Sequence, residues 1–204
     1  MKDDKETKER LLLSAKKEFL EKGYMQASLR NICKNAEVTT GALYFFFQNK
    51  EDLFACLVEK PLNELYEIIN QHHEREWNPL NAQADEVETY LEHFEIAKQA
   101  VHCIYHYYDE FQLLLTKAQG SGFAQIDDQF VERLEKKYRV MADHISLQNR
   151  APALEDYMLH WFAHTQMNLF VHMITHERAE ETAMKHLEAM MKGLVACWYQ
   201  LFQE

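Results

Sequence analysis

The chain has 204 residues with 22 Lys and Arg against 33 Asp and Glu, and its net charge of −11 excludes a wholly basic protein that coats nucleic acid. It contains only 5 Gly and 3 Pro, where average usage would supply about 24 of the two together, and this deficit argues against a turn-rich β fold. Apolar residues make up 47% of the chain, yet no run reaches the roughly 18 residues of a membrane span and the N-terminus does not read as a signal peptide. We therefore expect an all-α protein of the cytoplasm that does not associate with membranes.

Apolar residues recur at steps of three and four along the whole chain, which is the period of amphipathic helices. Gly23 is a candidate left-handed cap for the first helix, and Ser28 and Thr39 are candidate N-caps for the next two. Pro61 should kink or break the fourth helix, and Trp77-Asn-Pro-Leu-Asn81 is the clearest linker. About nine helices are predicted, over residues 5–22, 29–36, 40–46, 50–72, 85–108, 110–119, 127–147, 153–175 and 180–202.

The charge is unevenly distributed along these helices. Residues 1–50 hold ten Lys and Arg and seven acidic residues, a net charge of +3, which leaves −14 for residues 51–204. A weakly basic head on a strongly acidic body is expected when only the head binds a polyanion. The sequence thus predicts two domains, a head of residues 1–50 and a body of residues 51–204.

The second and third predicted helices are short and joined by a tight turn, which is the helix-turn-helix arrangement. Small residues at the start of the third helix would let its backbone approach the major groove, while hydroxyls there face phosphates at a helix N-terminus. Arg30 is the best candidate for a bidentate contact to guanine, and Lys50 for a phosphate contact. The candidate DNA-contacting residues are Ser28, Arg30, Thr39, Thr40, Gly41, Tyr44, Phe45 and Lys50.

The run from Thr7 to Phe54 resembles the DNA-binding domain of TetR-family transcriptional repressors. The motifs that carry the resemblance cover about a quarter of the chain and are Gly23-Tyr24, Leu29 with Ile32, Thr39-x-Gly41-x-Leu43-Tyr44 and Lys50-x-x-Leu53. The resemblance implies a three-helix helix-turn-helix domain followed by a helical ligand-binding and dimerisation domain. It also implies a regulator, expected to be a repressor, that binds a palindromic double-stranded DNA operator as a homodimer and is released by a small-molecule effector.

The sequence departs from the family pattern in two respects. Glu37 stands where the family often has glycine, so it must either accept a positive φ or alter the turn. Phe45 and Phe46 occupy a pair that is often polar or histidine in the family. Only one of the two rings can readily pack inward, and the other is free to contact a thymine methyl or the sugar backbone.

In the body, polar and aromatic residues on otherwise apolar helices are candidates for ligand contacts, although each is also explained by a place in the core. An acidic, aromatic-rich body favours a lipophilic cation over an anion as the ligand. The candidate ligand-binding residues are His102, Tyr105, His106, Trp161, His164, Thr165 and Asn168.

The last predicted helix carries apolar residues at steps of 3, 4, 3, 4 and 3 from Met184 to Leu201, which form a heptad seam. The seam fits either the core of its own domain or a four-helix interface with a second copy, and we expect the second. The candidate dimer-interface residues are Leu187, Met191, Leu194, Trp198 and Leu201.

Metal binding is an alternative suggested by three pairs of histidines spaced four residues apart, but no carboxylate or cysteine completes a ligand set. The four cysteines are far apart and read as buried thiols, and no phosphate loop or nucleophile elbow is present. We expect no enzyme activity, metal or cofactor. The alternative function is a His-rich helical metal-binding or carrier protein, which sequence-selective DNA retention would distinguish. The histidine pairs are His102/His106, His160/His164 and His172/His176.

Overall fold

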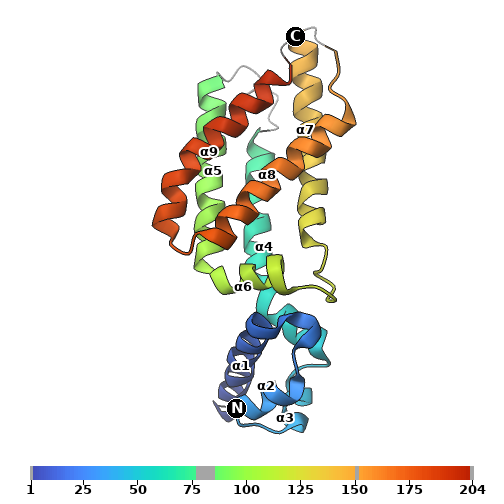
Figure 1. The fold of residues 1–204 in the computed structure, drawn as a ribbon, viewed down its shortest axis with the longest axis vertical. Coiled ribbons are helices and arrows are strands. Elements are labelled where there is room, and N and C mark those ends of the chain that lie inside the picture. The colour runs from blue at the N-terminus through green and yellow to red at the C-terminus, as the bar shows by residue number, and fades with distance from the viewer. Residues whose placement is uncertain (1, 77–85, 150–151, 203–204) are drawn as a thin grey trace. The chain divides into compact units, whose positions relative to one another are not determined.

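A computed structural model describes residues 2–76, 86–149 and 152–202 (Figure 1). Within these ranges the chain forms nine α-helices and no strand, so the predicted all-α fold class is confirmed. The predicted linker at residues 77–81 lies outside the described residues. The helices are α1 Lys2–Gln26, α2 Leu29–Asn35, α3 Thr40–Phe46, α4 Lys50–Glu76, α5 Glu86–His106, α6 Tyr108–Gln112 followed by the π-helical turn η2 Leu113–Lys117, α7 Ile126–Asn149, α8 Asp156–His176 and α9 Glu180–Gln200.

Gly23 and Pro61, residue types that often end a helix, both lie inside one. Gly23 has φ 73° and ψ 163°, a combination open almost only to glycine, and it kinks α1 rather than ending it, so that a further turn reaches Gln26. The positive φ is as predicted, but the conformation is not the left-handed helical one. Pro61 lies inside α4 and does not break it, since the helix continues to Glu76.

The chain divides into two compact units. Unit 1 consists of Met1–Glu67 with His106–Gln125, and unit 2 consists of Ile68–Tyr105 with Ile126–Glu204. This division differs from the predicted boundary at residue 50, because α6, η2 and the loop that follows them pack with the head. The polypeptide therefore crosses between the units three times.

The core of unit 1 is formed where α1 packs against α2, α3, α6 and η2. Phe19 lies edge-on to Phe54 with ring centroids 5.1 Å apart, and Phe54 contacts Phe123 of the loop after η2 at 6.0 Å. Lys16 of α1 pairs with Glu110 of α6 at 2.6 Å. These contacts hold α1 firmly, and α1 in turn supports the two short helices.

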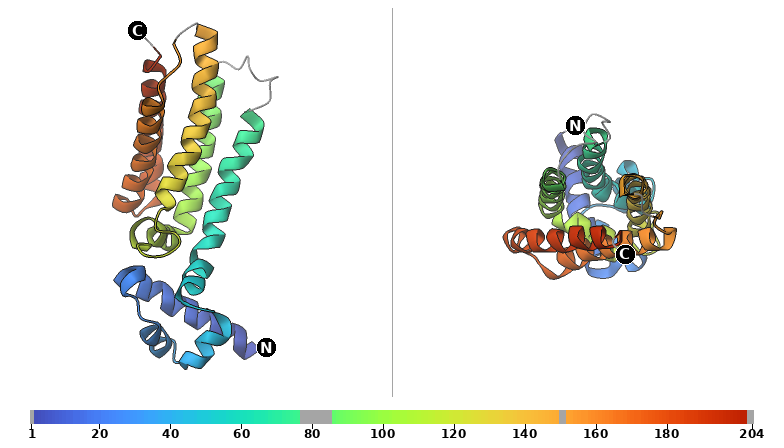
Figure 2. Two further views of the ribbon diagram at one scale, coloured as in Figure 1. Left: turned by 90° about the vertical axis from the view of Figure 1, so that its right-hand side faces the viewer. Right: turned by 90° about the horizontal axis from the view of Figure 1, so that it is seen from above.

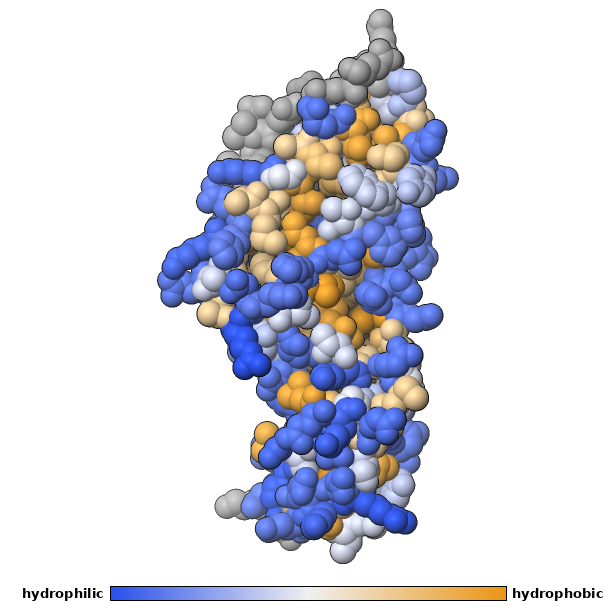
Figure 3. Space-filling view, in the orientation of Figure 1, coloured by the Kyte–Doolittle hydropathy of each residue, from blue (hydrophilic) through white to orange (hydrophobic). Residues whose placement is uncertain are grey.

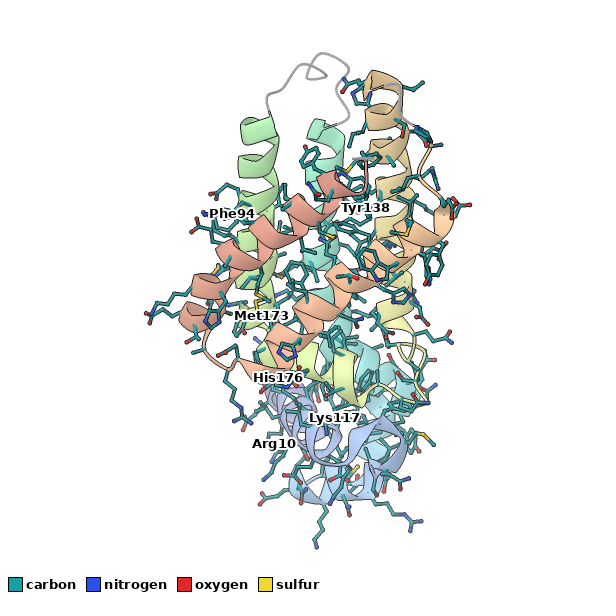
Figure 4. The ribbon with its side chains drawn as sticks, turned by 45° about the horizontal axis from the view of Figure 1, so that its top comes forward. Arg10, Phe94, Lys117, Tyr138, Met173 and His176 are labelled. Atoms are coloured by element: carbon teal, nitrogen blue, oxygen red, sulfur yellow. The ribbon has the colours of Figure 1, made fainter. Side chains whose placement is uncertain are left out.

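In unit 2, α8 and α9 lie side by side in one layer, with α5 and α7 in the layer behind them (Figures 1 and 2). An aromatic cluster joins these layers: Tyr138 of α7 has its ring 4.9 Å from both Phe162 of α8 and Trp198 of α9. Figure 4 labels Tyr138 in this interior position, together with Met173 of α8, which is 2% exposed.

A candidate DNA-binding surface

The start of α2 is fixed by a local hydrogen-bond network. Ser28 is the N-cap, and its hydroxyl accepts the N–H of Asn31 at 3.4 Å, as its sequence position predicts. The N–H of Ser28 and the side-chain amide of Asn31 both donate to Glu18 of α1, a buried carboxylate. Sequence reasoning missed Glu18, whose spacing from Ser28 carries no local signal.

The turn between α2 and α3 is strained at one residue. Glu37 has φ 55°, so it accepts the positive φ that glycine would adopt at less cost. The turn otherwise keeps its hydrogen bonds, since the N–H of Val38 donates to Cys33 at 3.0 Å. The first of the two expected outcomes for Glu37 is therefore the one observed.

The N-terminus of α3 is exposed and carries only small side chains. Thr39 is its N-cap and accepts the N–H of Ala42 at 3.2 Å, as predicted, while Thr40 and Gly41 are exposed. A Cβ built on Gly41 would meet only the Thr39 hydroxyl, at an ordinary 3.8 Å. Since the fold has room for a side chain here, the glycine leaves space for something outside the chain.

The rest of α3 separates sharply into a buried and an exposed side. Leu43 and Phe47 are buried and belong to the core of unit 1. Tyr44 is 56% exposed and Phe45 76% exposed, while Phe46 is half-buried. Of the two departing phenylalanines, the structure thus turns Phe45 outward.

Arg30 of α2 lies near the start of its helix and is exposed. It makes no hydrogen bond or ion pair with any residue in the described part of the chain. Its guanidinium is therefore available as a donor of paired hydrogen bonds.

Lys50 is held by the protein itself. Its ammonium donates to the main-chain carbonyls of Met25 and Ala27, both at 3.1 Å, and lies 4.7 Å from the centre of the Tyr24 ring. Burial lowers the pKa of Lys50 from its ordinary value. Lys50 thus ties the kinked end of α1 to the start of α4, an explanation for a cation at a helix N-terminus that the sequence did not reveal. Its phosphate contact stays a prediction.

The exposed side of α2 and α3 therefore combines hydroxyls at a helix N-terminus, small residues, two aromatic rings and one free guanidinium. These groups suit a polyanion whose surface also offers apolar edges, which is the chemistry of a DNA major groove.

The sequence pattern of the family described as bacterial regulatory proteins, tetR family, matches residues 11–57, which include α2 and α3. Residues 11–57 therefore carry the N-terminal domain pattern of this family. The HTH-type transcriptional repressor BepR of Brucella suis biovar 1 (strain 1330) is 41% identical over 66 residues. This match covers 32% of each chain, so it spans about a third of that relative's length.

Two solved structures resemble this chain in fold over nearly its whole length. A transcriptional regulator from Aquifex aeolicus VF5 is 23% identical with a TM-score of 0.55, covering 92% of this chain and 99% of its own. NalD of Pseudomonas aeruginosa, the secondary repressor of the MexAB-OprM multidrug efflux pump, is 20% identical with a TM-score of 0.55, covering 95% and 97%. At these identities the likeness concerns the fold alone.

The structure does not bring the seven predicted ligand residues into one interior site. His102 is exposed, with Nδ1 2.7 Å from Glu180, and the Tyr105 hydroxyl donates to the Glu177 carbonyl at 2.8 Å, so both fasten the turn between α8 and α9. His106 belongs to unit 1. The residues on α8 lie toward its outer side: Trp161 is 41% exposed, Asn168 is exposed, and His164 and Thr165 are half-buried.

The predicted dimer seam lies mostly inside the protomer. Leu187, Met191, Leu194 and Trp198 are buried within their own protomer, at 0 to 8% exposure, and only Leu201 is half-buried. A side chain that α5, α7 and α8 already cover has no surface left for a second copy. The seam is thus the inner side of α9, which was the alternative reading of the same pattern.

The histidine pairs on α8 form as the spacing predicts. The rings of His160 and His164 lie 4.4 Å apart and those of His172 and His176 4.0 Å apart. Within the described residues, however, no group of three or more His, Cys, Asp or Glu could hold a metal ion. Over the same residues, no helix is long and apolar enough to cross a membrane.

Proposed function

We propose that this TetR-family regulator binds a palindromic operator as a homodimer, represses transcription there, and is released when a small molecule binds unit 2. The observation that carries the proposal is the exposed side of α2 and α3, whose Arg30, Thr40 and Tyr44 contribute nothing to the core. Residues 1–50 have a net positive charge in an otherwise acidic chain, which supports DNA binding through this part of the protein.

Operator binding is tested by selecting duplexes from a random pool with the full-length protein. A palindromic consensus with half-site centres about 34–36 Å apart, or somewhat more, is expected. Arg30→Ala should then relax discrimination at one base pair by roughly 1–3 kcal/mol. Equal weakening on selected and scrambled duplexes would reassign Arg30 to a phosphate contact, and recovery of no consensus would overturn the proposal.

For the dimer, we place the interface on the outward sides of α8 and α9. Hydrophobic residues are visible on this side of unit 2 (Figure 3). The aromatic residues Tyr157 and Trp161 of α8 are also exposed. On α9 the exposed residues include Ala189, Gly193 and Ala196, whose small side chains permit close approach of a partner helix.

Gly193 provides a clean test of this interface. Gly193 is exposed and a Cβ built there meets nothing within 4 Å, so the protomer has open space at this position, and replacing glycine inside a helix favours folding. Gly193→Arg should give a folded monomer in sedimentation with weaker operator binding, whereas the matched Gly193→Ala should remain dimeric. A Gly193→Arg variant that remains a dimer would place the interface elsewhere.

For the ligand, the interior of unit 2 offers two buried polar atoms that lack a hydrogen-bond partner in the described part of the chain. They are the indole N–H of Trp198 and the side-chain carbonyl oxygen of Gln166. Unpaired buried donors and acceptors cost free energy, which a ligand that pairs with them would recover. The Trp198 indole lies against the Tyr138 and Phe162 rings, so a site at its N–H suits a flat aromatic molecule, and the acidic body favours a cation.

A lipophilic dye cation such as rhodamine 6G is the first probe for this site. The affinity of the protein for the dye should fall in Trp198→Phe, which keeps an aromatic ring but removes the indole N–H donor. Because linkage is reciprocal, operator DNA must lower the affinity for any ligand that lowers operator affinity. Equal affinities for free and operator-bound protein would mean that the site does not regulate DNA binding.

A further inference from the structure

The recognition surface of α3 lacks the side chains that usually read bases by paired hydrogen bonds. From Thr40 to Phe46 the helix contains no Arg, Lys, Asn, Gln, Asp or Glu, and its only side-chain polar groups are the hydroxyls of Thr40 and Tyr44. A single hydroxyl bonds to several bases and discriminates weakly among them. Base reading by α3 must therefore rest largely on apolar contact.

Phe45 is the residue placed to make that contact. It is 76% exposed and, four residues after the exposed Gly41, lies on the same side of α3 as that glycine. An aromatic ring exposed to this extent contributes little to the core, yet offers a large apolar area to a partner.

The ring of Phe45 is also held in place from behind. It lies edge-on to Phe46 with centroids 5.0 Å apart, and Phe46 in turn lies 6.3 Å from Phe47, which is 1% exposed. Three consecutive rings thus lead from the core to the surface. Such support reduces the side-chain entropy that binding would otherwise remove.

We propose that Phe45 reads the C5-methyl group of thymine in the major groove, an inference that rests on the proposed operator binding. The methyl group is the one apolar feature that distinguishes thymine among the base edges of this groove. Phe45 then selects T·A pairs by apolar contact, while Arg30 supplies the hydrogen-bonded reading from α2.

The test uses a duplex selected as above, in which each thymine is replaced singly by deoxyuridine. This change removes only the methyl group and keeps the base pair. At one or two positions in each half-site, affinity should fall by about fourfold, the equivalent of one CH2-sized group left unburied. Phe45→Ala should bind the selected duplex more weakly and be insensitive to deoxyuridine at those same positions, and the matched Tyr44→Phe should stay sensitive.

The outcomes separate this inference from the proposed function. A selected duplex that binds tightly but tolerates every deoxyuridine would overturn the role of Phe45 and leave operator binding intact. Uniform weakening by Phe45→Ala, with methyl sensitivity retained, would show that its ring packs on the sugar-phosphate backbone. The deoxyuridine series with unaltered protein decides the point even if Phe45→Ala fails to fold, whereas absence of any selected consensus would remove the proposed function itself.

Discussion

Replacing Lys50 by methionine should loosen the end of α1 more than it weakens DNA binding. Methionine keeps an unbranched apolar side chain but removes the ammonium that donates to Met25 and Ala27. Those two carbonyls belong to the turn that follows the kink at Gly23. The change therefore releases the segment that leads directly into α2.

The free energy lost on replacing Lys50 can be worked out from its contacts. Hydrogen bonds from a charged donor contribute about 1.5–3 kcal/mol each, and the half-buried position of Lys50 favours the low end. The contact with the Tyr24 ring adds about 0.5 kcal/mol, while desolvation of the ammonium, which lowers its pKa, offsets part of the total. We expect a loss of about 2 kcal/mol, equivalent to roughly 30-fold faster hydrogen exchange in the affected segment.

Hydrogen exchange of the full-length protein, followed by mass spectrometry on peptides from residues 19–36, measures this loss locally. Peptides from α8 serve as the internal control and should not change. In parallel, the salt dependence of binding to unselected duplex reports on phosphate contacts, since loss of one contact reduces the slope by about 1. Unchanged exchange in residues 19–36 combined with a shallower salt slope would refute the structural role and establish Lys50 as a phosphate contact.

Three further predictions concern stability. Glu37→Gly should raise stability by about 0.5–1 kcal/mol by relieving its positive φ, visible as a higher midpoint in thermal unfolding of unit 1; an unchanged or lower midpoint would contradict the strain. Leu187→Ala should cost about 2–5 kcal/mol in urea unfolding monitored by tryptophan fluorescence, and dissociation of a dimer without this loss would contradict its place in the core. Burial and the carboxylate of Glu51 raise the pKa of Tyr24 to about 12, so its contribution is complete below pH 10 and is lost as the pH rises towards 12. The stability difference between the unaltered protein and Tyr24→Phe should shrink across that interval, and a constant difference would contradict the shift.

The sequence predicted the helix-turn-helix segment well because its signals are local. Ser28 and Thr39 cap helices by bonding to N–H groups three residues ahead, so cap and helix are read from the same short stretch. The positive φ at Glu37 is one of the two outcomes that its place in the turn predicted. By contrast, the roles of Glu18 and Lys50 depend on partners 10 to 25 residues away, and no local sequence pattern predicts these contacts.

The ligand residues of unit 2 were harder to predict, because a polar residue on an apolar helix has several possible environments. Tyr105 bonds to a turn and Asn168 lies in solvent, although both occur in similar sequence surroundings. The atoms that remain unpaired inside the core belong to Gln166 and Trp198, which the sequence did not single out as polar contacts. Only the three-dimensional inventory of hydrogen bonds separates satisfied polar groups from unsatisfied ones.

The burial of the heptad seam within its own protomer has a physical reason that extends beyond this chain. A heptad pattern measures how much apolar area lies along one side of a helix, but not which neighbour covers it. In α9 the large apolar residues, such as Leu187 and Leu194, are used by the protomer's own core, since that core must form whether or not a second copy is present. What remains for a partner is the opposite side, where Ala189, Gly193 and Ala196 offer little apolar area but allow close helix contact. Association through this side of α9 would depend on shape complementarity more than on hydrophobicity. A search for hydrophobic patterns therefore overlooks this side, although it is the accessible one.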